Sequence, residues 1–193
     1  MKMYYYYGVM GSSKTANALM KKFSFEEHGK RVLLIKPSID NRDGKITVKS
    51  RVGISCDALI IDQDKTIKEI IEPYKDIDII IVDEAQFLTA LQVEELRDLT
   101  LNGIMVMCYG LKTDYMGNLF EGSKRIIELA DTIREIPSMC NCGKKAIMNA
   151  RIQNDKIVYK GNQIDIGGNE KYKAMCYECW ISGVDNANIT ASD

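Results

Sequence analysis

The sequence predicts an α/β protein with a parallel sheet, helices on both faces of that sheet, and a small metal-binding subdomain at the C-terminal end. Three observations carry this prediction. Apolar β-type runs alternate with segments of helical periodicity. The run at 79–82 is β-branched and does not alternate, which is typical of a buried parallel strand. From about Pro137 the chain changes to cysteines, glycines and short β-type runs.

Length and composition limit the classes of protein. The chain has 193 residues, of which 46% are hydrophobic and 27% charged, with a formal net charge of -1. This fits one ordinary domain with an appendage and is too short for two full-sized lobes. No basic field predicts a nucleic-acid polymer as partner, and no run of about 18 apolar residues predicts a membrane span. The N-terminus lacks the apolar core of a signal peptide, so we expect a cytoplasmic protein.

The first predicted strand and helix flank a glycine-containing loop. The aromatic run MYYYYGVM favours a strand and leads directly into GSSKT. The next segment carries Ala18, Leu19, Phe23 and Phe25 at roughly helical spacing and stops at Gly29. The chain therefore predicts a strand, a loop and a helix in that order.

The remaining elements follow from periodicity and from turn residues. The segment 40–57 is polar and contains glycines, so we expect a surface excursion there. Strands are predicted at 32–36, 58–61, 79–82 and 104–111, and helices at 66–74, 91–101 and 121–130. Strands that alternate with helices imply right-handed crossovers and a parallel sheet. The small polar residues of 183–193 predict a disordered tail.

The stretch GVMGSSKT matches the phosphate-binding pattern G-x-x-x-x-G-K-[ST] except at Ser13, where the pattern has glycine. Such a loop directs backbone N–H groups and the positive end of a helix dipole at phosphate oxygens. Lys14 would neutralise the β and γ phosphates, and the hydroxyl of Thr15 would bind Mg²⁺. The alternative is a strand-to-helix turn without a ligand.

An acidic pair follows the buried strand at 79–82. Asp83 and Glu84 fall at the carboxyl end of that strand, where parallel sheets bind their ligands. Asp83 could hold the Mg²⁺ of a nucleotide, and Glu84 could orient an attacking hydroxyl and accept its proton. Two capping or solvated carboxylates are the alternative, but the loop and the acidic pair together favour a nucleotide site. The single histidine, His28, falls at the end of the first helix, where a dipole contact explains it.

Four cysteines form two closely spaced pairs. Cys140 and Cys142 make C-x-C, and Cys176 and Cys179 make C-x-x-C. Two such pairs are typical of a closed tetrahedral zinc site with a structural role. Free thiols or a redox pair are the alternative. Cys108 lies in an apolar run and is expected to pack in the core.

The segment NQIDIGGNEKYKAMC, which ends at the second cysteine pair, contains two adjacent glycines. Glycines allow a backbone to approach a ligand closely, and Tyr172 could cover such a ligand. An ordinary glycine turn also explains the spacing. From spacing alone the turn is the favoured interpretation.

Taken together, these motifs resemble the type II thymidine kinase family, whose members carry a zinc-bearing lasso domain. The resemblance covers Met3 to about Trp180 and rests on GVMGSSKT, DNR, VDEAQF, CYGLKTDYMGNLF, the four cysteines and IGGNEKY, in the family's order. It implies a P-loop (RecA-like) parallel sheet with helices on both faces, plus a small C-terminal zinc-binding lasso subdomain. It also implies transfer of the γ-phosphate of ATP to the 5′-hydroxyl of thymidine or deoxyuridine in nucleotide salvage, with Mg²⁺ and a structural Zn²⁺.

The resemblance implies a role for each matching residue. Glu84 matches the proton-accepting glutamate, and Thr15 and Asp83 match the magnesium positions. The positions implied to bind ATP are Gly8, Val9, Met10, Gly11, Ser12, Ser13, Lys14, Thr15, Asp40, Asn41, Arg42, Asp83, Glu84, Ala85 and Gln86. The positions implied to surround thymidine are Met10, Leu111, Tyr115, Phe120, Gln163, Ile164, Asp165, Ile166, Gly167 and Tyr172. Zinc is implied at Cys140, Cys142, Cys176 and Cys179.

Within the thymidine set, the resemblance reverses the interpretation of the glycine segment. Residues 163–167 match the lasso, whose backbone groups hydrogen-bond the pyrimidine edge, and Tyr172 matches the residue that closes the pocket. Fixed backbone groups can read the acceptor, donor and acceptor of a thymine edge without charged side chains. Residues 1–137 are thus expected to form the nucleotide-binding domain and 138–182 the lasso subdomain.

Two residues depart from the family pattern. Ser13 stands where the family has glycine, and its Cβ could strain the loop by about 1 to 3 kcal/mol. Tyr115 stands where many members have phenylalanine, and its hydroxyl needs a partner. The family is usually tetrameric, which implies a homo-oligomer. Two other classes stay open: a P-loop ATPase with a zinc element that binds nucleic acid or protein, and a catalytically weak binding protein.

Overall fold

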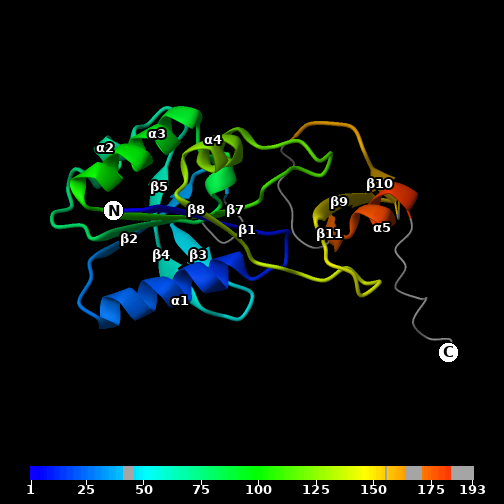
Figure 1. Ribbon diagram of the computed structural model, residues 1–193, viewed down its shortest axis with the longest axis horizontal. Helices are drawn as coiled ribbons and strands as arrows, with labels where there is room; N and C mark the ends of the chain where they lie inside the picture. Colours follow the sequence, from blue (N-terminus) through cyan, green and yellow to red (C-terminus); the bar gives the residue numbers. More distant parts are fainter. Residues whose placement is uncertain (41–45, 155, 164–170, 184–193) are drawn as a thin grey trace.

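The computed structural model describes residues 1–40, 46–154, 156–163 and 171–183. Its main feature is a six-stranded sheet, made of β1 Met3–Tyr7, β2 Val32–Pro37, β5 Leu59–Ile61, β6 Ile79–Val82, β7 Met105–Gly110 and β8 Thr132–Glu135. The strand order is β5-β2-β6-β7-β1-β8 (Figure 1), and every neighbouring pair runs parallel. The predicted parallel α/β fold is confirmed.

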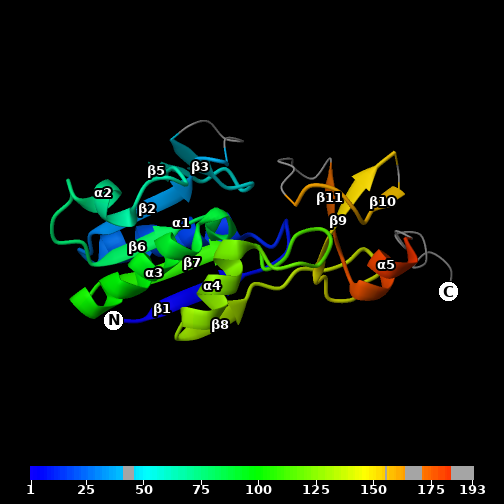
Figure 2. The same ribbon diagram turned by 90° about the horizontal axis from the view of Figure 1, so that it is seen from above.

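Helices cover both faces of this sheet, as Figures 1 and 2 show. One face carries α1 Lys14–Glu27, and the other carries α2 Ile67–Ile71, α3 Ala90–Leu99 and α4 Glu121–Leu129. The cause is the alternation of side chains along each strand. In β6, Ile80 and Val82 pack in the cluster that contains α3, whereas Ile79 and Ile81 pack in the cluster that contains α1. All four residues of β6 are buried, as expected for a central parallel strand.

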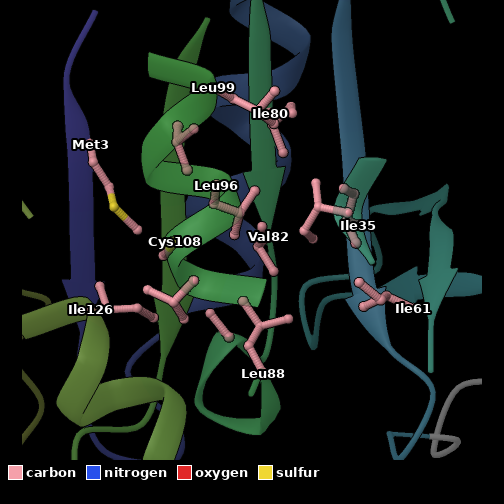
Figure 3. Packing of buried hydrophobic residues seen from close by; sticks show 14 of the residues in the cluster. Met3, Ile35, Ile61, Ile80, Val82, Leu88, Leu96, Leu99, Cys108 and Ile126 are labelled. Atoms are coloured by element: carbon pink, nitrogen blue, oxygen red, sulfur yellow. The ribbon is translucent and has the colours of Figure 1, made fainter. Parts of the chain in front are cut away.

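The larger core lies between the sheet and the helices α2, α3 and α4. Figure 3 shows Leu96 of α3 against Val82 of β6, with Cys108 of β7 beside them. Cys108 is fully buried, which confirms the predicted core position. This apolar layer fixes α3 and α4 over the sheet and so holds the ends of β6 and β7 in place.

The strand order brings the sequence motifs to one edge of the sheet. Because β6, β7 and β1 are adjacent and parallel, their carboxyl ends meet at that edge. Gly8 follows β1, Asp83 follows β6 and Leu111 follows β7. The phosphate-type loop and the acidic pair are therefore separated by the width of a single strand, β7.

The segment 40–57, which we expected as a surface excursion, contains a two-stranded hairpin. It consists of β3 Thr47–Lys49 and β4 Ser55–Asp57. Val48 is buried in the cluster of α1, and the buried Lys36 Nζ donates to the carbonyl oxygen of Thr47 at 2.9 Å. The hairpin therefore packs on the α1 side of the sheet.

Sequence periodicity missed one strand of the sheet. The edge strand β8 has the sequence TIRE, in which charged and polar residues hide any apolar pattern. Two short 3₁₀ helices, Ala85–Phe87 and Thr100–Asn102, follow β6 and α3. The 3₁₀ helix Ala85–Phe87 begins directly after the acidic pair.

The C-terminal region forms a second, antiparallel sheet. Its strands are β9 Met148–Gln153, β10 Lys156–Val158 and β11 Tyr172–Met175, in the order β10-β9-β11, and α5 Tyr177–Ser182 follows. Figure 2 shows this sheet and α5 beyond the edge of the main sheet where the loops lie. The predicted division at residue 137 stays a prediction, and residues 184–193 of the predicted tail 183–193 lie outside the described residues. Within the described ranges, no helix is long and apolar enough to span a membrane.

Candidate active site

The loop between β1 and α1 has the backbone conformation of a tight turn. A Cβ at Gly8 would lie only 2.4 Å from the carbonyl oxygen of Ile136 and from Ser12 Oγ, so only glycine fits there. Gly11 has φ +80, a value that glycine adopts without strain. Glycine is thus required at position 8 by lack of space and favoured at position 11 by the backbone angle.

Ser13 adopts the conformation that the phosphate-loop pattern reserves for glycine. Its φ is 61 and its ψ is 28, which is left-handed, and its side chain makes no capping hydrogen bond to α1. A non-glycine residue in this region costs about 1 to 2 kcal/mol. The side chain of Ser13 is exposed, so its Cβ is not buried against the loop.

Lys14 lies beneath the loop. It is buried, and its Nζ donates to the carbonyl oxygens of Gly8 at 3.0 Å and Val9 at 2.9 Å. Nearby, the buried Ser12 Oγ has no hydrogen-bond partner among the described residues. A cation and an unsatisfied hydroxyl at the N-terminus of α1 are the groups that a phosphate would satisfy.

Asp83 joins the acidic strand end to the loop. Thr15 Oγ1 donates to Asp83 Oδ2 at 2.9 Å, and Asp83 is 3% exposed. Burial, followed by the negative charge of Glu84, raises the pKa of Asp83 to about 7. Its Oδ1 is buried and has no partner within the described part of the chain. A carboxylate oxygen and a hydroxyl oxygen are ligands that Mg²⁺ accepts, and the ion's charge would offset the cost of burying Asp83.

Glu84 is held by its own backbone and by Gln86. Its φ of 53 and ψ of 36 are left-handed, so it is strained in the same way as Ser13. Gln86 Nε2 donates to Glu84 Oε2 at 2.5 Å, and Gln86 Oε1 accepts the N–H of Leu111 at 3.0 Å. The buried amide of Gln86 therefore fixes the Glu84 carboxylate relative to the end of β7.

The residues expected around a nucleoside lie on the segment after β7 and on the second sheet. Phe120 is buried and contacts Phe87 edge-on, with ring centroids 5.7 Å apart. Tyr115 lies 6.5 Å from Tyr172 between ring centroids, and the guanidinium of Arg151 lies over the Tyr115 ring at 5.4 Å. Aromatic and apolar side chains thus come together from three separate parts of the chain.

The hydroxyl of Tyr115 has no hydrogen-bond partner within the residues that the structure describes, although it is buried. It points at the backbone of Gly161, where an added Cβ would lie 2.7 Å from the hydroxyl oxygen. The partner that the sequence led us to require is therefore absent from this part of the chain. Gly161 has φ +140, so its backbone angle as well as the close Tyr115 hydroxyl favours glycine there.

The second sheet meets the phosphate-type loop directly. Val9 is buried in the apolar cluster formed by β9, β11 and α5, which includes Met148 and Trp180. Beside it, the N–H of Met10 donates to Asn149 Oδ1 at 2.8 Å. One turn of the loop therefore belongs to the core of the C-terminal region.

The four paired cysteines converge in that same region. The Sγ atoms of Cys140, Cys142, Cys176 and Cys179 lie within 4.8 Å of one another. A tetrahedral zinc site with Zn–S bonds of about 2.3 Å requires sulfur atoms roughly 3.8 Å apart, so the cluster fits such an ion. Burial raises the pKa of Cys140, but hydrogen bonds from the backbone of Cys142 and Cys176 outweigh it and hold the pKa at about 7. The pKa values of Cys142 and Cys179 are instead raised, because four thiols this close together do not titrate independently, so the spacing of the sulfur atoms is the observation that fits a metal site.

Several predicted site residues lie outside the described residues. These are Asn41, Arg42, Ile164, Asp165, Ile166 and Gly167. Their described neighbours are placed: Asp40 is buried after β2, and Gln163 Nε2 donates to Asp114 Oδ2 at 3.1 Å.

Sequence reasoning missed three residues that the structure brings to this site. Phe87 packs against Phe120, Asn149 contacts the loop, and Asp114 contacts Gln163. Phe87 and Asp114 fall inside the motifs VDEAQF and CYGLKTDYMGNLF, so both residues could have been predicted from these motifs. Asn149 had only a weak signal, a polar residue between the apolar Met148 and Ala150.

Comparison with protein families gives one match that spans most of the chain. A model of the family "Thymidine kinase" matches residues 1–180. This range includes the loop, the acidic pair, the aromatic residues and all four clustered cysteines.

Curated relatives agree with the family match. A thymidine kinase of Enterobacteria phage T4 is 45% identical over 179 residues, 90% of this chain and 92% of the relative. One from Zymomonas mobilis is 40% identical over 191 residues, 96% and 98% of the two chains. One from Streptococcus pyogenes is 43% identical over 182 residues, 91% and 94%. Among solved structures, the Pif1 helicase of Candida albicans aligns with a TM-score of 0.40 and 13% identity. The alignment covers 70% of this chain and 36% of the helicase, and this likeness is too weak to bear on function.

Proposed function

The chain belongs to the thymidine kinase family, and from this premise we propose that it transfers the γ-phosphate of ATP to the 5′-hydroxyl of thymidine or deoxyuridine. The observation that carries the proposal is the meeting of loop and acidic pair at one edge of the sheet. The Thr15–Asp83 hydrogen bond of 2.9 Å joins them, and Glu84 stands next to Asp83.

We assign the phosphate side of the reaction to the loop. Lys14 and the N-terminus of α1 bind the β and γ phosphates, and the buried Ser12 hydroxyl completes the contacts. Thr15 and the unpartnered Asp83 Oδ1 would hold Mg²⁺, which neutralises charge on the phosphates. Phosphoryl transfer is mainly a matter of positioning and charge, and these residues supply both.

We assign proton acceptance to Glu84. The 5′-oxygen of the nucleoside forms a bond to the γ-phosphorus while the bond from that phosphorus to the bridging oxygen of ADP breaks. The hydroxyl proton goes to the Glu84 carboxylate, which Gln86 holds in place through its 2.5 Å hydrogen bond. The products are then ADP and the nucleoside monophosphate.

We assign the nucleoside to the aromatic side of the site. Leu111, Tyr115, Phe120 and Tyr172 supply apolar surface for the base and sugar. The lasso 163–167 would supply the backbone groups that read the pyrimidine edge, and the cysteine cluster would hold one structural zinc ion at the base of the lasso. A tetramer in the cytoplasm completes the proposal. The six cysteines form no disulfides, which suits a reducing compartment.

The proposal is tested by a transfer assay with Mg-ATP and four conditions: thymidine, deoxyuridine, deoxycytidine and no acceptor. We expect ATP consumption that depends on thymidine or deoxyuridine. Equal consumption with and without a nucleoside would refute the kinase and favour the ATPase class. No consumption in any condition, with ADP still bound, would favour a binding protein.

Glu84→Gln tests the assigned base. We expect the rate of transfer to fall by about 10²- to 10⁴-fold because the proton loses its acceptor, while ADP affinity stays within about twofold. Glu26→Gln, an exposed glutamate paired with Lys22 on α1, is the charge-matched control and should keep full activity. Retained transfer in Glu84→Gln would assign the proton to another group.

A further inference from the structure

Asn149 connects the two sides of the site through both ends of one amide. It is 3% exposed, and it lies on β9 of the C-terminal sheet. Its Oδ1 accepts the N–H of Met10, in the phosphate-type loop, at 2.8 Å. Its Nδ2 donates to the carbonyl oxygen of Thr113, in the segment after β7, at 3.2 Å. Met10 and Thr113 lie outside the named helices and strands. The Asn149 amide provides a hydrogen-bond partner for the N–H of the first and for the carbonyl oxygen of the second.

The chain of hydrogen bonds continues from Thr113 to the entry of the lasso. The next residue, Asp114, is 2% exposed, and its Oδ1 accepts the N–H groups of Met116 at 2.8 Å and Asn118 at 2.9 Å. Its Oδ2 accepts from Gln163 Nε2 at 3.1 Å. A buried carboxylate with three donors is rigidly oriented. The two residues directly before Tyr115, Thr113 and Asp114, are therefore held by Asn149 and by Gln163 respectively.

The amide is the side chain that this position requires. A carboxylate of the same shape could accept from Met10 but could not donate to Thr113. An apolar side chain of the same volume would leave both backbone groups without partners. Val9, the residue before Met10, lies in the apolar cluster of β9, β11 and α5, so packing as well as the Asn149 hydrogen bond holds the loop against this sheet.

We propose that Asn149 is a positioning residue shared by the two substrate sites, and that it couples them: a nucleoside bound on the lasso side favours nucleotide binding on the loop. This inference rests on the proposed function for the identity of the two ligands. The hydrogen bonds behind the inference do not depend on that identity, because they join a loop that would bind phosphate to a segment that would bind the base. By linkage, each ligand raises the affinity for the other by the same factor.

The test measures the affinity of the full-length, zinc-loaded protein for ADP, with and without saturating thymidine, by calorimetry. ADP and thymidine cannot react, so binding is measured at equilibrium. For the wild type we expect thymidine to raise ADP affinity by about fivefold or more. For Asn149→Leu, which keeps the branched shape and loses both hydrogen bonds, we expect the ratio to fall to near one. Asn149→Ala should behave in the same way.

Gln92→Leu is the matched control. Gln92 is also a buried amide that joins two segments, because its Nε2 donates to the carbonyl oxygens of Asp62 at 2.9 Å and Lys65 at 2.8 Å. Its loss should lower the melting temperature by a similar amount and leave the coupling ratio unchanged. This comparison separates a change in positioning from a general loss of stability.

Two outcomes would overturn the inference. The first is a coupling ratio in Asn149→Leu equal to that of the wild type. The second is a wild type that binds both ligands with a ratio of one. If the wild type binds ADP and no thymidine, the proposed function fails, and the positioning claim is then judged on ADP alone: unchanged ADP affinity in Asn149→Leu would overturn it, and a severalfold loss would support it.

Discussion

The two sheets of this protein are held together by different means. The six-stranded sheet lies between two apolar clusters, and its central strand is buried on both faces. The three-stranded sheet has one smaller cluster, in which three of the buried residues are cysteines of the metal-type site. The first region can be stabilised by burial alone, whereas the second is of the size at which small domains depend on a metal.

The difference matters because the two regions share the phosphate-type loop. Val9 is buried in the smaller cluster, while Thr15 donates to Asp83 at the end of β6 in the main sheet. Loss of the smaller cluster would therefore disturb the loop without unfolding the sheet. Changes in the six-stranded sheet should therefore mainly alter the free energy of unfolding, and changes in the three-stranded sheet should mainly alter ligand binding.

Removal of one cysteine should have the largest effect. Structural zinc contributes about 10 to 16 kcal/mol of binding free energy in small zinc domains, and it is lost when a ligand is missing. We expect Cys142→Ser to lose its zinc by elemental analysis and to lose thymidine binding, while circular dichroism still shows most of the helical signal. Cys56→Ser, outside the cluster, should keep one zinc per chain. Full zinc content in Cys142→Ser would contradict the proposed ion site.

A cavity in the main core should have the next largest effect. Leu96 is fully buried between α3 and β6, so Leu96→Ala should lower the free energy of unfolding by about 2 to 5 kcal/mol in urea titrations. Zinc content should not change, because the cysteine cluster lies in the other region. Leu101→Ala, at a side chain 81% exposed, should stay within about 0.5 kcal/mol of the wild type. Loss of zinc in folded Leu96→Ala would show that the regions are not separable.

Ser13→Gly should stabilise the loop. The left-handed φ of 61 is free of strain for glycine, so we expect a gain of up to about 1 kcal/mol, reduced by the greater flexibility of unfolded glycine. ADP affinity should stay equal or rise slightly in calorimetry. The same substitution at Ser24, inside α1, should instead destabilise by about 0.5 to 1 kcal/mol. A loss of stability in Ser13→Gly would mean that the serine side chain contributes a contact of its own.

Tyr115→Phe should have the smallest effect. Its hydroxyl is buried and has no partner within the described residues, so its removal should be neutral or stabilise by up to about 1 kcal/mol. Tyr5→Phe is the contrasting variant, because the Tyr5 hydroxyl donates to the carbonyl oxygen of Leu111 at 2.8 Å. It should lose about 1 kcal/mol in the same thermal melts. Equal losses in both variants would indicate that the Tyr115 hydroxyl has a partner after all.

Much of the fold and the loop could be predicted from the sequence. The parallel sheet follows from the alternation of β and α segments, and the meeting of GVMGSSKT with Asp83 follows from the rule that parallel strands end at one edge. The cysteine cluster follows from the spacing of the two pairs. Each of these depends on a local pattern or on a general rule of topology.

The contacts between distant segments could not be predicted. Nothing near Asn149 in the sequence indicates that its amide reaches Met10, 139 residues away. The strand β8 was missed because its sequence TIRE has the polarity of an edge. The left-handed backbone at Glu84 was also missed, since glutamate has no preference for that conformation and only the surrounding structure imposes it.

At position 84, the residue that would best stabilise the fold is not the residue that the proposed reaction needs. Most L-amino acids, glutamate included, are strained at φ 53, and glycine would relieve that strain most fully. Glycine, however, has no carboxylate to accept a proton. A screen that selects only for heat resistance would therefore choose glycine at position 84 and, under the proposed mechanism, recover a more stable protein that no longer transfers phosphate. Engineering for thermal tolerance should leave this residue out of the library and draw its gains from Ser13 and other positions.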